Sequence, residues 1–458
     1  MTVTTLQKLV EPILNAAKVP GAALTFVSDD GKVQTVCFGI RKIGEESPVT
    51  DSTRFAIASV SKAFTAAAVA SAIDDGKMTW DDPVRKHLPA FRLLDPAADA
   101  SVTIRDLLCH RTGLPRHDGL WYRSNLERTE ILRRIAFLKP SATFRGAYQY
   151  NNLCFAVAGE AVAAAVGKSY EDYLREKLLL PLGMDVTFSG QNLSPADAAP
   201  HRTIKDEMKP IEPLDFFNVG PAGAMNVNPA DMGKWIRHQL SPTDALAETH
   251  RPQMVVPLDD QTRRLYPDRI QQSYALGWSL YDWQGQPVLS HGGSIDGFRS
   301  HLVLLPRQKI GFSILINLGK DGVVEQVRNT LLDRLLNGPR RSWLRLYREE
   351  AKREKANKKP AEKLPKIKPS LALSEYAGTY SEPGYGDVEI GFADEKLVLS
   401  WLGNAAPLKH KSRDLFVCDT DNLALQNKEI LFQLDGAGKP KTLSFVDQTF
   451  VKNKNTGG

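Results

Sequence analysis

One serine in this chain is followed by a lysine three residues later: Ser59, with Lys62. The pair lies where an apolar segment runs into an Ala-rich stretch that predicts a helix. At the start of a helix, this spacing puts the hydroxyl and the amine on one face, beside unpaired N–H groups and partial positive charge. Acyl transfer through a serine ester requires such a set of groups. Because S-x-x-K is a weak pattern by itself, its interpretation depends on partners elsewhere in the chain.

A second motif, Tyr150-x-Asn152, comes just before another Ala-rich helix. An asparagine at such a boundary is also typical of a helix N-cap. To act as a base near pH 7, a phenol with an ordinary pKa of about 10 needs a decrease of about three units, or roughly 4 kcal/mol. One ammonium group nearby in a partly desolvated cleft is enough for that. Lys62 with a lowered pKa is the alternative base, and the two groups would titrate together.

A third motif, His291-Gly292-Gly293-Ser294, closes an apolar strand. Adjacent glycines can simply mark a turn or a bulge. They also let a strand edge approach an acylated serine and offer a backbone N–H to an oxyanion. Each motif is ambiguous alone, whereas the three together indicate one reaction site.

The elements around these motifs predict an α/β fold whose antiparallel sheet is flanked by helices. Two early strands and three or four late strands are separated by a long, mostly helical block, and a helix closes the domain. The expected strands are 21–28, 32–39, 274–281, 287–291, 301–306 and 310–316. The expected helices are 104–109, 127–137, 153–166, 170–180, 229–240 and 323–336.

A different composition begins after Gly338-Pro339. Residues 341–370 are predicted to be a charged helical linker, because Lys and Arg concentrate there. From residue 371 short strands recur with turn signals between them, which predicts a small antiparallel barrel. We therefore expect a domain over 1–340 with a helical insertion at about 62–270, the linker, and a barrel over 371–458. The six expected barrel strands are 378–380, 387–392, 396–401, 414–419, 429–434 and 442–446.

Composition and charge narrow the functional classes. The 458 residues carry a net charge of +6, but the run from Arg340 to Lys368 holds twelve Lys and Arg against four Asp and Glu. The rest is slightly negative, so no nucleic-acid groove is expected. No apolar run is long enough to span a bilayer, and the N-terminus reads as an amphipathic helix and not as a secretory leader. The four cysteines lack C-x-x-C spacing, which favours reduced thiols in a cytoplasmic protein.

The three motifs resemble those of the serine β-lactamase and penicillin-binding-protein superfamily, in the branch of class C β-lactamases, esterases and D-aminopeptidases. The resemblance covers roughly residues 10 to 337, and several members of the branch carry a C-terminal lipocalin-like barrel. It implies that Ser59 is the nucleophile, Lys62 its proton-handling neighbour and Tyr150 the general base or acid. It also implies that Asn152 holds Lys62 and the substrate amide, and that the N–H groups of Ser59 and Ser294 form the oxyanion hole.

The chain departs from the family at one motif. Many lactamases have lysine-threonine-glycine where this chain has His291-Gly292-Gly293. A histidine is largely neutral at pH 7, so its help to a substrate carboxylate or to Tyr150 should be weaker or dependent on pH. We expect His291 to tune the reaction between about pH 5 and 8. Ester and small-peptide chemistry is therefore favoured over β-lactam recognition.

Several functions stay open. With water as the acceptor, the protein is a hydrolase of esters, of D-aminoacyl peptides or amides, or of β-lactams; with an amine, it is a thioesterase-like acyltransferase that cyclises or transfers peptidyl groups. A non-catalytic binding or sensor protein on the same fold is the alternative from a different class. The sequence has no G-x-S-x-G motif of α/β-hydrolases and no H-E-x-x-H metal motif. We expect no cofactor and no metal, a small-molecule or short-peptide substrate, and a chain compatible with a homo-oligomer.

Overall fold

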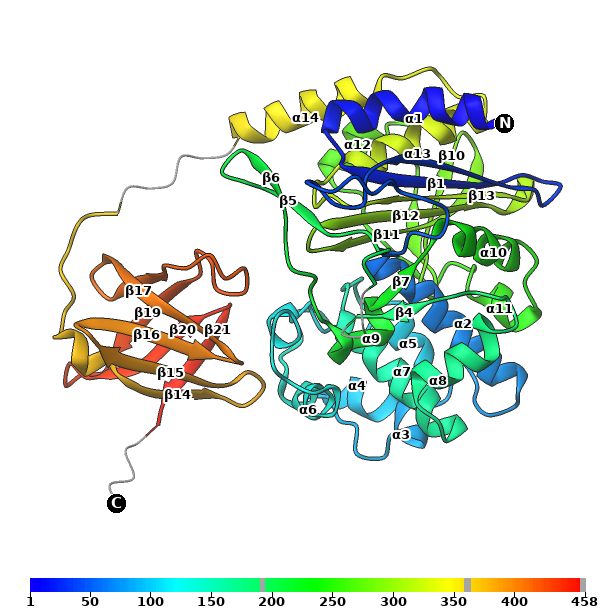
Figure 1. Cartoon of the computed structure of the whole chain (residues 1–458). Coiled ribbons are helices and arrows are strands. Elements are labelled where there is room, and N and C mark those ends of the chain that lie inside the picture. The colour runs from blue at the N-terminus through cyan, green and yellow to red at the C-terminus, as the bar shows by residue number, and fades with distance from the viewer. Residues whose placement is uncertain (190–193, 358–363, 454–458) are drawn as a thin grey trace. The chain divides into compact units, whose positions relative to one another are not determined.

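The computed structural model describes residues 1–189, 194–357 and 364–453 (Figure 1). Within these residues the chain forms two compact units. The first contains residues 1–91, 95–116 and 140–357, and the second contains residues 92–94, 117–139 and 364–453.

An eight-stranded antiparallel sheet is the centre of the first unit. Its order is β2-β1-β13-β12-β11-β10-β9-β8, so the two strands from the start of the chain join the late strands through β1 and β13. The antiparallel sheet formed by both ends of the domain is thereby confirmed. The strands are β1 Gly21–Val27, β2 Val33–Gly39, β8 Met254–Val255, β9 Gln272–Tyr274, β10 Ser279–Trp283, β11 Gln286–Ile295, β12 Phe298–Leu305 and β13 Ile310–Ile316.

Helices cover both faces of this sheet, as Figure 1 shows. All seven residues of β1 are buried, which fits a strand that packs on two sides. On one side, α1 (Val3–Ala17) and α13 (Val323–Leu335) share an apolar core with the strands. On the other side, α10 (Pro229–Leu240) packs against β1 and β13. The helix α14 (Trp343–Asn357) lies within the predicted linker, and it buries Trp343 in the same core as α1 and α13.

The helical block lies between β3 (Phe55–Ala56) and β8 in the chain. Its centre is α2 (Ser61–Asp74), which is buried on nearly all sides and packs on α7 (Asn152–Val166). Its other helices are α3 Val84–His87, α4 Pro96–Ser101, α5 Ile104–Leu108, α6 Arg128–Arg134, α8 Tyr170–Leu174, α9 Gly220–Gly223 and α11 Asp244–Glu248, while α12 Asp260–Leu265 follows β8. Its small strands are β4 Thr187–Phe188, β5 His201–Ile204, β6 Glu207–Pro210 and β7 Met225–Val227. The predicted strand over 274–281 is in fact two, β9 and β10, because the chain turns at Gly277, where φ is +79°.

The second unit contains a closed barrel of eight antiparallel strands, as the sequence predicted. The strands are β14 Gly378–Glu382, β15 Gly386–Ala393, β16 Lys396–Trp401, β17 Asn404–Ser412, β18 Leu415–Cys418, β19 Glu429–Leu434, β20 Pro440–Phe445 and β21 Gln448–Lys452. The sequence predicted six of them and missed β17 and β21.

The segment of residues 117–139 belongs to the same unit as the barrel. The ring of His117 lies 2.8 Å from the Tyr385 hydroxyl, and the Asn404 amide donates to the Arg123 carbonyl at 2.7 Å. The predicted first domain, residues 1–340, includes this segment. The predicted boundaries at 340 and 371 stay a prediction. Part of the predicted linker, residues 358–363, lies outside the described residues.

No single helix among the described residues has the length and apolar character to cross a bilayer. Only the bent pair Asn152–Val166 and Tyr170–Leu179 passes that test together, with 77° between its halves. The first of these two helices is mostly buried inside the protein.

Candidate active site

Ser59 lies in a tight 3₁₀ turn, η1 (Ala58–Val60), directly before α2. The sequence predicted it at the start of the helix, and the structure places it two residues before α2 begins. Ala58 has φ +45°, a left-handed conformation that is costly for a residue with a Cβ atom. Ala58 and Val60 are buried while Ser59 is partly exposed. The strained turn therefore presents the serine hydroxyl to the solvent side of a buried segment.

Lys62 is completely buried, and its amine lies at the centre of the site. Its Nζ is 3.1 Å from Ser59 Oγ, 2.7 Å from Asn152 Oδ1 and 2.8 Å from the Ala222 carbonyl oxygen. The amide and carbonyl oxygens can only accept, so they take two N–H bonds of the amine. The remaining position on the Lys62 nitrogen points at Ser59 Oγ. There an ammonium would donate a hydrogen bond to the serine, whereas a neutral amine would accept the serine proton. Both roles of Lys62 fit this geometry.

The Tyr150 motif begins α7. Asn151, and not Asn152, is the helix cap, because its Oδ1 accepts from the Cys154 N–H at 3.0 Å. Asn152 is thus left to hold Lys62. The Tyr150 ring centre lies 4.9 Å from Lys62 Nζ and 4.9 Å from the Arg116 guanidinium carbon. The phenol of Tyr150 therefore lies close to two basic side chains.

The glycine motif on β11 meets the serine turn directly. A Cβ atom on Gly293 would lie 2.1 Å from the Ile57 carbonyl oxygen, so only glycine allows this approach. The Ser300 hydroxyl donates to the same oxygen at 2.7 Å and joins β12 to the turn. Ser294, the next residue on β11, is exposed. Gly292 faces the other side of the sheet, toward His301, and makes no such approach.

His291 is buried, and both of its ring nitrogens are occupied. Nδ1 lies 2.7 Å from the Gly292 carbonyl oxygen and must donate to it. Nε2 lies 2.8 Å from the Tyr274 hydroxyl and therefore accepts from it. Burial, with the nearby Lys62 charge, lowers the pKa of His291 to about 3. The expectation that His291 titrates between pH 5 and 8 is wrong, because desolvation outweighs its partners.

Two residues near Tyr150 escaped the sequence analysis. Tyr274, on β9, lies seventeen residues before His291 and meets it only through strand pairing. His110 follows α5, is completely buried, and its ring centre is 4.4 Å from that of Tyr150. Neither residue belongs to a local motif. For His110, a polar residue two positions after the helix Ile104–Leu108 was the only available signal.

A cavity of about 440 Å³ is lined by residues close in sequence to Ser59 and Ser294, but by none of the predicted site residues. Its lining includes Ala56, three residues before Ser59, and Ile295 and Asp296, which directly follow Ser294. The full charged lining comprises Arg54, Asp197, Glu212, Asp215 and Asp296. Arg54 is ion-paired with Asp197 at 2.8 Å, so the cavity has an excess of negative charge.

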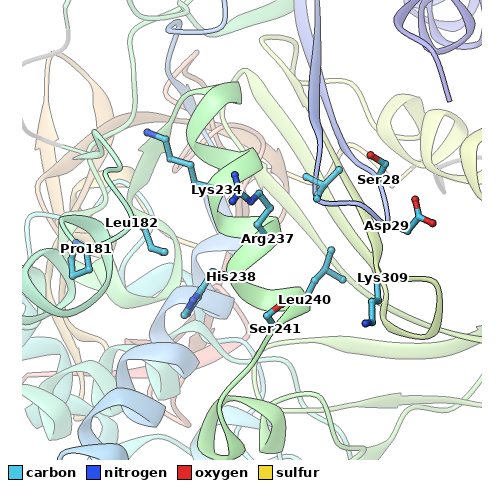
Figure 2. A pocket seen from close by; sticks show the side chains of 12 residues that line it. Ser28, Asp29, Pro181, Leu182, Lys234, Arg237, His238, Leu240, Ser241 and Lys309 are labelled. Carbon is cyan, nitrogen blue, oxygen red and sulfur yellow. The ribbon is translucent and has the colours of Figure 1, made fainter.

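Another cavity, of about 450 Å³, lies at α10 and the turn after β1 (Figure 2). Lys234, Arg237 and Lys309 line it, and none of the predicted site residues does. Among the described residues, no group of three or more His, Cys, Asp or Glu side chains could hold a metal ion.

Comparisons with known proteins show the family and the fold of this chain. Residues 6–337 match the family described as Beta-lactamase, and residues 362–456 match a domain of unknown function, DUF3471. The unguisins hydrolase ungD' of Aspergillus campestris is 28% identical over 422 residues, covering 86% of this chain and 78% of that protein.

Two solved structures share the fold. The octameric penicillin-binding protein homologue from Pyrococcus abyssi has a TM-score of 0.64 and 22% identity, covering 99% of this chain and 100% of that chain. A class C β-lactamase from Rhodobacter sphaeroides has a TM-score of 0.60 and 18% identity, covering 73% of this chain and 99% of that chain.

Proposed function

The chain belongs to the β-lactamase family of serine hydrolases, and from that premise we propose that it cleaves ester or amide bonds of small substrates through an acyl-enzyme on Ser59. One observation carries the proposal. The buried Lys62 amine bonds both to Ser59 Oγ and to Asn152 Oδ1, at 3.1 and 2.7 Å, and so joins two motifs ninety residues apart.

The reaction follows from these contacts. Ser59 Oγ attacks the substrate carbonyl carbon while its proton passes to Lys62 or Tyr150. The backbone N–H groups of Ser59 and Ser294 stabilise the oxyanion that forms. The protonated base then donates to the leaving alkoxide or amine, which leaves an ester on Ser59. Water, deprotonated by the same base, hydrolyses that ester and regenerates the serine.

The charge of the 440 Å³ cavity supports a preference among substrates. A lining rich in carboxylates favours neutral or cationic substrates and opposes a carboxylate such as that of penicillin. The neutral His291 at the lysine position of many lactamases acts in the same direction. Neutral esters and D-aminoacyl peptides or amides are therefore the proposed substrates, and β-lactams the weakest.

Acyl transfer to an amine is the second candidate. It shares every step up to the acyl-enzyme and differs only in the acceptor. The named relative ungD' is called a hydrolase, which favours water. A binding protein without catalysis would not require the Lys62 contact with Ser59.

A substrate panel tests the proposal. The purified protein is assayed with p-nitrophenyl esters, D-aminoacyl p-nitroanilides, nitrocefin and a peptidyl thioester, with and without an added amine. We expect hydrolysis of neutral and cationic substrates, with kcat/KM for nitrocefin lower by at least about 100-fold, or roughly 3 kcal/mol. Cyclised or amine-coupled products would instead establish acyl transfer. No turnover of any of them would overturn the enzyme assignment. Size-exclusion chromatography in the same buffer tests for a homo-oligomer, as in the octameric homologue.

A further inference from the structure

His110 makes two backbone-directed hydrogen bonds, one to each neighbour of Tyr150. Its carbonyl oxygen accepts from the Gln149 N–H at 2.8 Å. Its ring Nδ1 accepts from the Asn151 N–H at 3.1 Å. Tyr150 is therefore the residue between two backbone N–H groups that are both held by His110.

The ring of His110 also forms part of the wall around Tyr150. Because Nδ1 accepts, the neutral ring carries its proton on Nε2, and Nε2 has no hydrogen-bond partner among the described residues. The nearest rings are those of Tyr150, Tyr274, Phe155 and Tyr148, with centres 4.4, 4.8, 5.2 and 5.7 Å away. Burial, followed by the charges of Lys62 and Arg116, keeps the pKa of His110 well below its usual value. The ring fills space beside Tyr150 and does not exchange protons in the neutral range.

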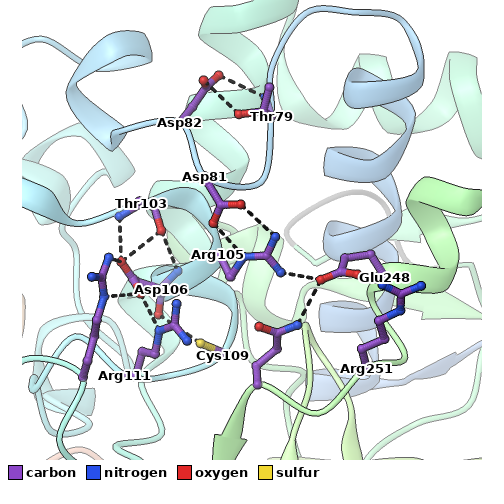
Figure 3. A network of polar contacts seen from close by, with 12 residues as sticks. Thr79, Asp81, Asp82, Thr103, Arg105, Asp106, Cys109, Arg111, Glu248 and Arg251 are labelled. Carbon is purple, nitrogen blue, oxygen red and sulfur yellow. Dashed lines mark hydrogen bonds and ion pairs between the residues drawn. The ribbon is translucent and has the colours of Figure 1, made fainter.

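An ionic network centred on the buried Asp106 fixes the backbone next to His110 (Figure 3). Asp106 is completely buried and accepts from Arg111 and Arg145, the latter at 2.7 Å. It also accepts from the Thr103 N–H at 2.9 Å, in the capping box that begins α5. His110 lies between Asp106 and Arg111 and has φ +59°, a strained conformation that needs such support. The loop is thus rigid where it contacts the Tyr150 segment.

We propose that His110 is a positioning residue that holds Tyr150 against Lys62 by clamping the backbone on both sides of it. The inference rests on the proposed function, because it assigns Tyr150 a role in proton transfer. His110 acts through Gln149 and Asn151, and its ring contacts Tyr150 and not the reacting Ser59. It should therefore affect kcat and leave KM nearly unchanged.

Two substitutions separate the clamp from general packing. His110→Gly and His110→Asn both tolerate a positive φ, but only asparagine keeps an acceptor close to the position of Nδ1. With a p-nitrophenyl ester, and with rates normalised to the fraction of Ser59 labelled by a fluorophosphonate, we expect His110→Gly to lose at least about 10-fold in kcat. His110→Asn should recover most of that loss, and KM should stay within about threefold in both.

The double variant with Tyr150→Phe tests the direction of the effect. If His110 acts only through Tyr150, adding His110→Gly to Tyr150→Phe should cost no further kcat. The matched control is His250→Ala, which removes a histidine bonded to Gln239 elsewhere in the unit and should change kcat little. If His110→Gly does not fold, His110→Leu fills more of the lost volume without an acceptor and replaces it.

Three results would overturn the inference: wild-type kcat in the glycine variant, no recovery by asparagine, or an equal loss in the Tyr150→Phe background. Failure of the proposed function is visible separately, because the wild-type protein would then neither label nor turn over the ester, and the inference would fall with it.

Discussion

Replacing Gly293 by alanine is the sharpest perturbation that the structure offers. The new methyl group would lie 2.1 Å from the Ile57 carbonyl oxygen and 2.1 Å from Ser300 Oγ. Real Cβ atoms essentially never come within 3.0 Å of another heavy atom in this way. One of the close atoms is backbone, so β11 and the serine turn η1 must separate by about 1 Å.

That displacement acts on the reaction because Ser294 is the next residue on β11. Moving a predicted oxyanion donor out of place costs about 100-fold to 1,000-fold in kcat, or roughly 3–4 kcal/mol. The overpacking itself should reduce the free energy of unfolding by about 1–3 kcal/mol. Activity should therefore fall by far more than the loss of folded protein explains.

The assay measures kcat and KM for a p-nitrophenyl ester, with the unfolding free energy from urea titration. Gly292→Ala is the neighbouring control, since its methyl group would lie 3.3 Å from His301 Nδ1, the end of a side chain that can shift. It should lose much less activity than Gly293→Ala. A folded Gly293→Ala variant with near-normal kcat would refute the reasoning that places β11 in the oxyanion site.

Three further predictions concern the site and its support. Lys62→Ala should lower kcat for the ester by about 1,000-fold, and Asn152→Ala should lower it by about 10-fold to 100-fold. The double variant should be scarcely worse than Lys62→Ala, because both residues act on the same step. Additive losses would contradict this shared role. Asp106→Asn should remove the charge of a completely buried carboxylate that accepts from Arg111 and Arg145 and should cost about 1–3 kcal/mol in urea unfolding, whereas a loss below about 0.5 kcal/mol would contradict the network. Folding depresses the pKa of His291 from 6.5 to about 3, so the unfolded chain takes up the proton first as pH falls, and stability declines below pH 6.5. That residue alone should contribute a loss of about 2 kcal/mol at pH 5, and an unfolding free energy equal at pH 7.5 and pH 5 would contradict its burial.

Local patterns predicted the regular elements well. The strand Ile310–Ile316 and the helix Pro229–Leu240 match the observed bounds, because an apolar run or a capped amphipathic pattern fixes each within its own residues. In the barrel, β17 escaped prediction because it contains Pro407 and is polar on one face. The segment forms a strand because it pairs with β16 and β18 in the closed barrel, although its own residues do not favour a strand.

The candidate site divides in the same way. Ser59 and Lys62 are three residues apart, so helical geometry alone predicts their contact. His110 and Tyr274 reach Tyr150 and His291 through a loop and a strand pair, and such contacts depend on tertiary packing. The pKa of His291 could not be predicted from the sequence either, because it depends on burial, and burial is known only once the fold is known.

The covalent intermediate on Ser59 is the central claim, and it can be trapped directly. The protein is mixed with a slowly hydrolysed aryl ester, quenched in acid within the burst phase, digested and mapped by mass spectrometry. We expect one acylated peptide, modified at Ser59 and absent in Ser59→Ala. An acyl group on another residue, or an adduct that persists in Ser59→Ala, would contradict it.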